Sequence, residues 1–130
     1  MNLFDTSSIF TAIMENRIDI LPGSTTIPLA SYELGNIVWK KTALQEELTL
    51  EESMALLQVI KNVVKTMRIH ENNGLNPDSL RLAQQEKLNY YDSSFIHAAI
   101  ELDSRIITED KQMQKTCLRL GVPVVSIKDV

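Results

Sequence analysis

The chain has 130 residues, a length that fits one domain and leaves little room for a second. Hydrophobic residues make up 44% and charged residues 23%, which excludes a disordered chain because there is enough apolar material for a core. The formal net charge of −4 excludes attraction of nucleic acid by the molecule as a whole, so any such binding has to be local. We therefore expect residues 1–130 to form one globular unit.

Cysteine and hydropathy patterns restrict the chemistry and the compartment. A single cysteine, Cys117, excludes an internal disulfide and a multi-thiolate zinc site, so a metal would need oxygen or histidine ligands. No apolar run approaches the roughly 20 residues that cross a bilayer, and strand-like sequence begins almost at Met1, which leaves no targeting segment. We expect a cytoplasmic protein without a membrane anchor.

Strand and helix patterns alternate in the first half of the chain. Residues 2–4 and 25–27 predict strands, and residues 7–15 and 29–44 have the apolar spacing of helices. Thr49 and Glu52 match a capping box, which predicts the start of a long helix. Between residues 53 and 65 the apolar positions cover more than one stripe, which predicts wide burial or an interface with a partner.

The second half continues the alternation. Asn76 and Pro77 predict the start of a polar helix, and Asp92 is expected to begin the next one. Residues 105–108 predict a strand, the following helix ends at Gly121, and residues 123–127 predict a last strand. Helices between strands indicate an α/β fold with a central, mainly parallel sheet of four or five strands, flanked by helices on both faces.

Four acidic residues are expected at one edge of this sheet. Asp5 and Asp110 follow predicted strands, and ligands of open parallel sheets bind beyond the carboxyl ends of strands. Asp92 and Asp110 lie at helix N-termini, where a carboxylate stays ionised at neutral pH. Glu33 lies near the start of the helix after the second strand and could reach the same edge.

Each of these acids also has a purely structural interpretation. An Asp at a helix start is most often an N-cap, and a lone Glu is usually a solvated helix residue. The set as a whole is harder to explain this way, because two unit charges about 4 Å apart repel by about 4 kcal/mol at an effective dielectric of 20. Convergence of the four would therefore require a cation.

The acidic residues stand in short segments whose order and spacing resemble a known family. The segments are Phe4-Asp5-Thr6-Ser7, Tyr32-Glu33-Leu34, Tyr91-Asp92-Ser93-Ser94-Phe95 with Ala98-Ala99, and Ile106-Ile107-Thr108-Glu109-Asp110. Together they resemble the four acidic motifs of PIN-domain ribonucleases, and most of all the small VapC-type toxins of toxin-antitoxin pairs. The resemblance spans the chain and rests on the ordered set, since each segment alone is short.

The resemblance implies a catalytic and metal-binding quartet of Asp5, Glu33, Asp92 and Asp110, holding one or two Mg²⁺ or Mn²⁺ ions. Such ions lower the pKa of bound water and neutralise a phosphate, so the implied reaction is hydrolysis of RNA phosphodiester bonds. Thr6, Ser7 and Thr108 match positions where the family keeps small hydroxyl residues that orient the ligands. A homodimer and a cognate antitoxin protein also follow from the resemblance.

Several other acidic, histidine and aromatic residues are expected to lie outside this site or are alternatives to its members. Asp103 lies eleven residues after Asp92, about 16 Å along a straight helix, so the two cannot share a metal. Glu109 is an alternative to Asp110 if the turn is wound differently, and Glu101 is expected to point elsewhere. No role in the site is expected for His70 or for His97, where the family usually has a small apolar residue. Trp39 is expected in the core, with base stacking as the alternative.

An acidic protein needs local basic residues to bind RNA, although each of them could equally belong to a solvated helix face. The candidates are Lys40, Lys41, Lys111, Lys115 and Arg119.

Other functions fit the sequence less well. A haloacid-dehalogenase-like phosphotransferase needs a second Asp where this chain has Ser7, and a phospho-receiver domain needs a central Asp and a late lysine. A PIN-fold RNA-processing nuclease without an antitoxin, and a non-catalytic RNA- or protein-binding module of the same fold, stay open.

Overall fold

The structure, a computed structural model, describes all 130 residues and contains five strands and six α-helices. The strands are β1 (Asn2–Phe4), β2 (Thr25–Thr26), β3 (Arg68–Ile69), β4 (Arg105–Ile107) and β5 (Val124–Val125). The helices are α1 (Thr6–Met14), α2 (Leu29–Trp39), α3 (Leu50–Val64), α4 (Pro77–Glu86), α5 (Tyr90–Glu101) and α6 (Lys111–Leu120). None of the helices combines the length and the apolarity needed to span a membrane.

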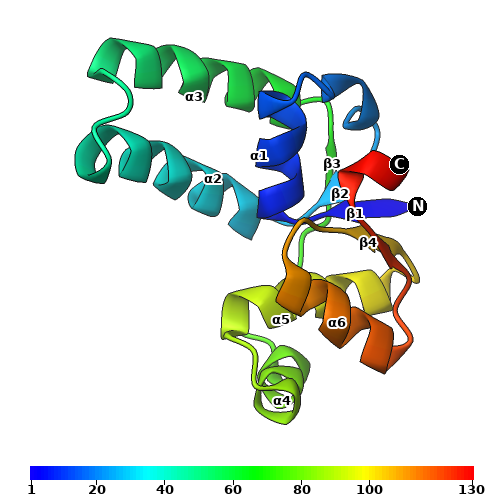
Figure 1. The fold of residues 1–130 in the computed structure, drawn as a ribbon. Helices are drawn as coiled ribbons and strands as arrows, with labels where there is room; N and C mark the ends of the chain where they lie inside the picture. Colours follow the sequence, from blue (N-terminus) through cyan, green and yellow to red (C-terminus); the bar gives the residue numbers. More distant parts are fainter.

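The five strands form one sheet in the order β3-β2-β1-β4-β5, and every neighbouring pair is parallel. Helices α1, α2 and α3 lie on one side of it, and α4, α5 and α6 lie on the other (Figure 1). This arrangement confirms the predicted α/β class, the parallel sheet and the helices on both faces.

The two central strands, β1 and β4, anchor the core. Their residues Leu3, Phe4, Ile106 and Ile107 are completely buried, in register with one another across the pair. Full burial of each such side chain contributes roughly 1.5–3 kcal/mol. These four belong to one cluster of 23 buried hydrophobic residues, to which helices on both faces contribute.

Three helix ends follow the predicted signals. The Thr49 hydroxyl accepts a hydrogen bond from the backbone N–H of Glu52, whose carboxylate accepts one from the N–H of Thr49. The Asn76 side chain caps α4, and Gly121 ends α6 with φ of 74°, a conformation that glycine adopts without a Cβ penalty.

Several element boundaries differ from the prediction. Strand β3 was not expected. Only two residues of the predicted strand 123–127 pair with β4, because Ser126 is already the N-cap of a 3₁₀ turn, η3 (Ile127–Asp129). Helix α2 ends at Trp39 and continues as a π-helical turn, η2 (Lys40–Leu44). A further 3₁₀ turn, η1 (Ile18–Ile20), precedes β2.

The expectation that α3 is widely buried is wrong. Ser53, Ile60 and Val63 face the core, whereas Met54 is 60% exposed and Leu57 and Val59 are also exposed. The core buries one face of this helix and leaves apolar side chains exposed beside it. Met54 and Leu57 form a short stripe along one edge of the buried face, and Val59 lies at the other edge. A groove of about 420 Å³ borders the stripe and is lined by Ser31, Leu34, Gly35, Leu57, Ile60, Lys61, Val64, Lys65, Met67 and Ile69.

Candidate active site

A cavity of about 670 Å³ lies beyond the carboxyl ends of the central strands. From β1 the chain proceeds to β2 on one side, whereas β4 pairs with β1 on the other, so the strand order reverses between β1 and β4. Open α/β sheets bind ligands at such a switch point. The cavity is lined by Asp5, Thr6, Ser7, Leu29, Tyr32, Glu33, Asn36, Ile37, Lys40, Tyr91, Asp92, Phe95, Asp110 and Met113.

Asp5 is fixed by the turn from β1 into α1. Its carboxylate accepts hydrogen bonds from the backbone N–H of Ser8 and the hydroxyl of Ser7, both at 2.9 Å, and from the hydroxyl of Thr108. The residue is 4% exposed, and burial raises the pKa of its carboxyl group above the usual 3.8, although the three hydrogen bonds act in the opposite direction. Asp5 is thus both an N-cap and a rigid carboxylate at the cavity.

Hydrogen bonds of the buried Ser8 hydroxyl and of the Asp5 backbone connect the turn around Asp5 to β4. The Ser8 hydroxyl donates to the carbonyl of Ile107 at 2.8 Å, and the N–H of Asp5 donates to the same carbonyl at 3.1 Å. These bonds hold the ends of β1 and β4 together, and with them the turns that carry Asp5 and Asp110.

Glu33 reaches the cavity from the first turns of α2. Its Oε1 accepts a hydrogen bond of 2.6 Å from the hydroxyl of Thr6. Burial raises the pKa of Glu33, with a smaller contribution in the same direction from the charge of Asp5, whereas the Thr6 bond lowers it. Thr6 therefore links the first two predicted acids.

Asp92 does not begin α5, contrary to the sequence-based expectation. Asn89 is the N-cap, and its side chain accepts from the N–H of Asp92 at 2.8 Å. The Asp92 carboxylate therefore has no capping role and receives no hydrogen bond from the protein. Its pKa is raised from 3.8 to about 6, first by burial and then by the charges of Asp110, Glu33 and Asp5.

Asp110 lines the cavity, whereas its neighbour Glu109 does not. The Asp110 carboxylate caps α6 by accepting from the N–H of Met113 at 3.0 Å. Glu109 turns toward the C-terminus, where its carboxylate accepts from the N–H of Ile127 at 2.7 Å. The sequence left open whether Glu109 or Asp110 is the site residue, and the turn after β4 places Asp110 at the cavity.

The four acids thus meet at one cavity, although they come from four separate segments. None of them forms an ion pair, and Lys40 is the one basic residue among those that line the cavity. Carboxylates and hydroxyls are the ligands that Mg²⁺ and Mn²⁺ prefer, so the donor set fits such an ion.

The carboxylates do not form a closed ligand cage. No three His, Cys, Asp or Glu side chains come together as a group able to hold a metal ion. Mg²⁺ is usually held by only one or two carboxylates, with water completing its shell, so an open arrangement of oxygen donors is compatible with it. Metal binding here stays a prediction.

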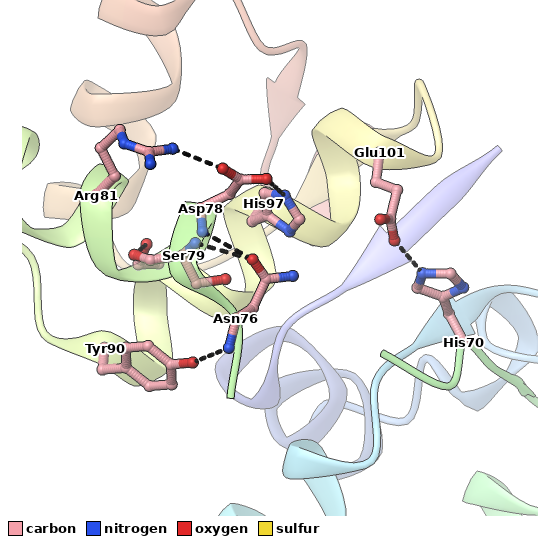
Figure 2. A network of polar contacts seen from close by, with 9 residues as sticks. His70, Asn76, Asp78, Ser79, Arg81, Tyr90, His97 and Glu101 are labelled. Carbon is pink, nitrogen blue, oxygen red and sulfur yellow. Dashed lines mark hydrogen bonds and ion pairs between the residues drawn. The ribbon is translucent and has the colours of Figure 1, made fainter. Parts of the chain in front are cut away.

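The residues expected outside the site do lie outside the cavity. Asp103 is exposed in the turn after α5, and Glu101 pairs with His70, with 2.7 Å between the carboxylate and Nε2. His97 Nε2 lies 3.9 Å from the carboxylate of Asp78 on α4 (Figure 2). The expectation that Trp39 is in the core is wrong, since its side chain is 50% exposed, and Trp39 does not line the cavity either.

Among the predicted RNA-binding residues, only Lys40 lines the cavity. Lys41 pairs with Glu47 at 3.2 Å and lies over the ring of Phe10. The others are on α6: Lys111 lines a separate cavity of about 350 Å³, Lys115 is exposed, and Arg119 pairs with Glu86 at 3.0 Å.

Three cavity residues that carry a polar group on the side chain were not singled out from the sequence. They are Tyr32, Asn36 and Tyr91. Residues 33, 36, 37 and 40 of α2 and η2 follow the spacing of one helix face, so the positions of Asn36 and Lys40 were readable from that of Glu33. Each tyrosine directly precedes an acidic residue of the cavity in the sequence, and this position was the signal that could have predicted both tyrosines as cavity residues.

Comparison with known proteins agrees with this fold. No protein-family profile matches the chain. The chain is 26% identical over 98 residues to Ribonuclease VapC3 of Pyrobaculum aerophilum, covering 75% of this chain and 74% of the relative. Its fold is similar to the crystal structure of PAE2754 from the same organism, with a TM-score of 0.78 and 19% identity over 98% of this chain and 91% of the other. The structural match fits the PIN-like fold expected from the sequence.

Proposed function

We propose that this chain is a metal-dependent endoribonuclease that uses Asp5, Glu33, Asp92 and Asp110 to hydrolyse RNA phosphodiester bonds. The observation that carries the proposal is the meeting of these four carboxylates at one cavity without a paired cation. Similarity to Ribonuclease VapC3 supports the choice of RNA as the substrate.

The carboxylates have distinct tasks in this proposal. Asp5 is held by three hydrogen bonds and Asp110 by one, so both present oxygens at fixed positions. Asp92, without a hydrogen-bond donor, is the carboxylate most available to a cation. Mg²⁺ or Mn²⁺, as one ion or two, would supply a water of lowered pKa and neutralise charge on the phosphate. Lys40 would bind a neighbouring phosphate of the substrate.

The test is RNA cleavage by the wild-type protein with Mg²⁺, with Mn²⁺ and with EDTA. We expect cleavage with either metal and none with EDTA. Asp5→Asn and Asp92→Asn should each lower the rate by two orders of magnitude or more, whereas Asp103→Asn, outside the cavity, should cleave at a near-normal rate. Full activity of both cavity variants would refute the assignment.

We further propose that the chain acts as the toxin of a toxin-antitoxin pair and forms a homodimer. The exposed stripe of α3 and the adjoining groove support a protein interface, because contiguous apolar surface of this kind marks binding sites. Lys61 and Lys65 at the groove suit an acidic segment of the antitoxin.

Light scattering after size-exclusion chromatography tests the dimer. We expect a mass of two chains for the wild type and of one chain for Leu57→Glu, with RNA cleavage retained if the dimer does not complete the active site. A monomeric wild type would contradict the dimer. Failure to find an inhibitory protein encoded beside this chain would contradict the toxin role and leave an RNA-processing nuclease.

A further inference from the structure

Two large aromatic side chains line the cavity yet remain in solvent. Tyr32 on α2 is 80% exposed and Tyr91 on α5 is 55% exposed. Helices α2 and α5 belong to the layers on opposite sides of the sheet (Figure 1), so the two tyrosines come from opposite walls of the cavity. Each directly precedes one of its carboxylates, Glu33 and Asp92.

Neither exposed tyrosine contributes a side-chain hydrogen bond that would stabilise the fold. Neither the Tyr32 nor the Tyr91 hydroxyl forms a hydrogen bond with the protein, whereas that of the adjacent Tyr90 does. The Tyr90 hydroxyl accepts from the N–H of Asn76 at 2.8 Å (Figure 2) and donates to the carbonyl of Gly74 at 2.6 Å. Tyr90 thus fixes the loop before α4, and Tyr91 leaves its ring face available to a ligand.

The cavity offers few protein cations to RNA phosphates, so a further source of RNA affinity is expected. Four carboxylates and one lysine line it, and the whole chain carries a net charge of −4. A polyanion gains little here from protein cations. Stacking of bases on aromatic rings supplies affinity without positive charge, and every base has a face that stacks.

We propose that Tyr32 and Tyr91 determine specificity for single-stranded RNA by stacking on unpaired bases at the two walls of the cavity. In a duplex the bases are stacked on one another and their faces are not accessible, so a double-stranded RNA would not engage the tyrosines. This inference rests on the proposed function, because it names the form of RNA that the same cavity accepts.

The test measures affinity apart from cleavage. Asp92→Asn serves as the non-cleaving background, and the probe is a fluorescein-labelled RNA of about 12 nucleotides, followed by anisotropy with Mg²⁺ as a single strand and as a duplex. Adding Tyr32→Ala or Tyr91→Ala should weaken single-strand binding roughly fivefold or more, and the Phe variants should stay within about twofold of the background, since the ring and not the hydroxyl stacks.

Matched controls separate stacking from damage to the fold. Leu80→Ala removes an exposed side chain on α4, outside the cavity, and should change no affinity. Binding of the duplex should be weaker than that of the single strand and insensitive to both Ala variants. Loss of affinity in the Phe variants equal to that in the Ala variants, or unchanged single-strand affinity in both Ala variants, would overturn the inference.

The result also distinguishes this inference from the proposed function. Cleavage by the wild type with unchanged binding by the Ala variants would remove the stacking role and keep the nuclease. Tyrosine-dependent binding without cleavage under any metal would remove the nuclease and keep a single-strand RNA-binding module. Absence of both binding and cleavage would overturn both proposals.

Discussion

Asp92 is the cavity carboxylate that the protein leaves without a hydrogen-bond donor, and its neutralisation should stabilise the metal-free fold. The pKa of its carboxyl group is about 6, against 3.8 in an unfolded chain, because burial and the charges of Asp110, Glu33 and Asp5 disfavour the ionised form. We therefore expect Asp92→Asn to raise the free energy of unfolding at about pH 8.

The pH dependence of this stability gain follows from the linkage between folding and protonation of Asp92. The folded state binds the Asp92 proton more tightly than the unfolded state, so the stabilisation from protonation is fully present below pH 3.8 and is lost as the pH rises through about 6. The Asn side chain imitates the neutral form at every pH. The gain in stability from the substitution should thus be largest above about pH 7 and small near pH 4.

Solvent screening limits how much Asp92→Asn can raise the free energy of unfolding. A shift of about two pKa units would correspond to about 3 kcal/mol for a fully desolvated group. Because the Asp92 carboxyl group is only half-buried, screening reduces the expected gain to about 1 kcal/mol. For a chain of this length, that gain raises Tm by roughly 4 °C.

Thermal unfolding followed by circular dichroism measures this effect, in EDTA, at several pH values from about 4 to 8. Asp129→Asn, at an exposed carboxylate of η3, is the control and should leave Tm unchanged. Added Mg²⁺ should raise the Tm of the wild type more than that of Asp92→Asn, since a ligand stabilises the state that binds it. Equal Tm values at about pH 8, or a difference that grows toward acid, would refute the reasoning.

Three further substitutions test the support of the site. Ser8→Ala leaves the buried carbonyls of Asp5 and Ile107 without its hydroxyl and should lower the free energy of unfolding by about 1–3 kcal/mol in denaturant titrations; an unchanged midpoint would contradict this. Thr108→Val removes the hydroxyl donor to Asp5 and should destabilise by about 1.5–3 kcal/mol at about pH 8, and by less at about pH 5, where more Asp5 is protonated; equal loss at both values would count against a charged Asp5. Gly121→Ala, at φ of 74°, should cost about 1 kcal/mol by the same titration, and a neutral effect would show that the end of α6 can adjust.

Local signals in the sequence were sufficient for most of the fold. The buried apolar segments of β1 and β4 predicted the central strands, and Thr49, Asn76 and Gly121 marked helix ends through contacts made within a few residues. Such contacts depend on neighbouring residues alone, so they are readable without a structure. Strand β3 was missed because two residues carry no periodic pattern and the pairing with β2 is what makes them a strand.

The tertiary structure decided what the acidic residues do relative to one another. The sequence by itself determined that Asp5 and Asp110 follow strands and that Glu33 lies on a helix, and it placed Asp92 at the start of one. Only the fold showed that Asn89 caps α5, so that the Asp92 carboxylate is free to line the cavity. Only the fold showed that the Glu109 carboxylate binds the N–H of Ile127, whereas Asp110 lines the cavity. The burial and the charge repulsion that raise the pKa of Asp92 come from residues that are distant in sequence and close in space. No local sequence pattern encodes this closeness in space.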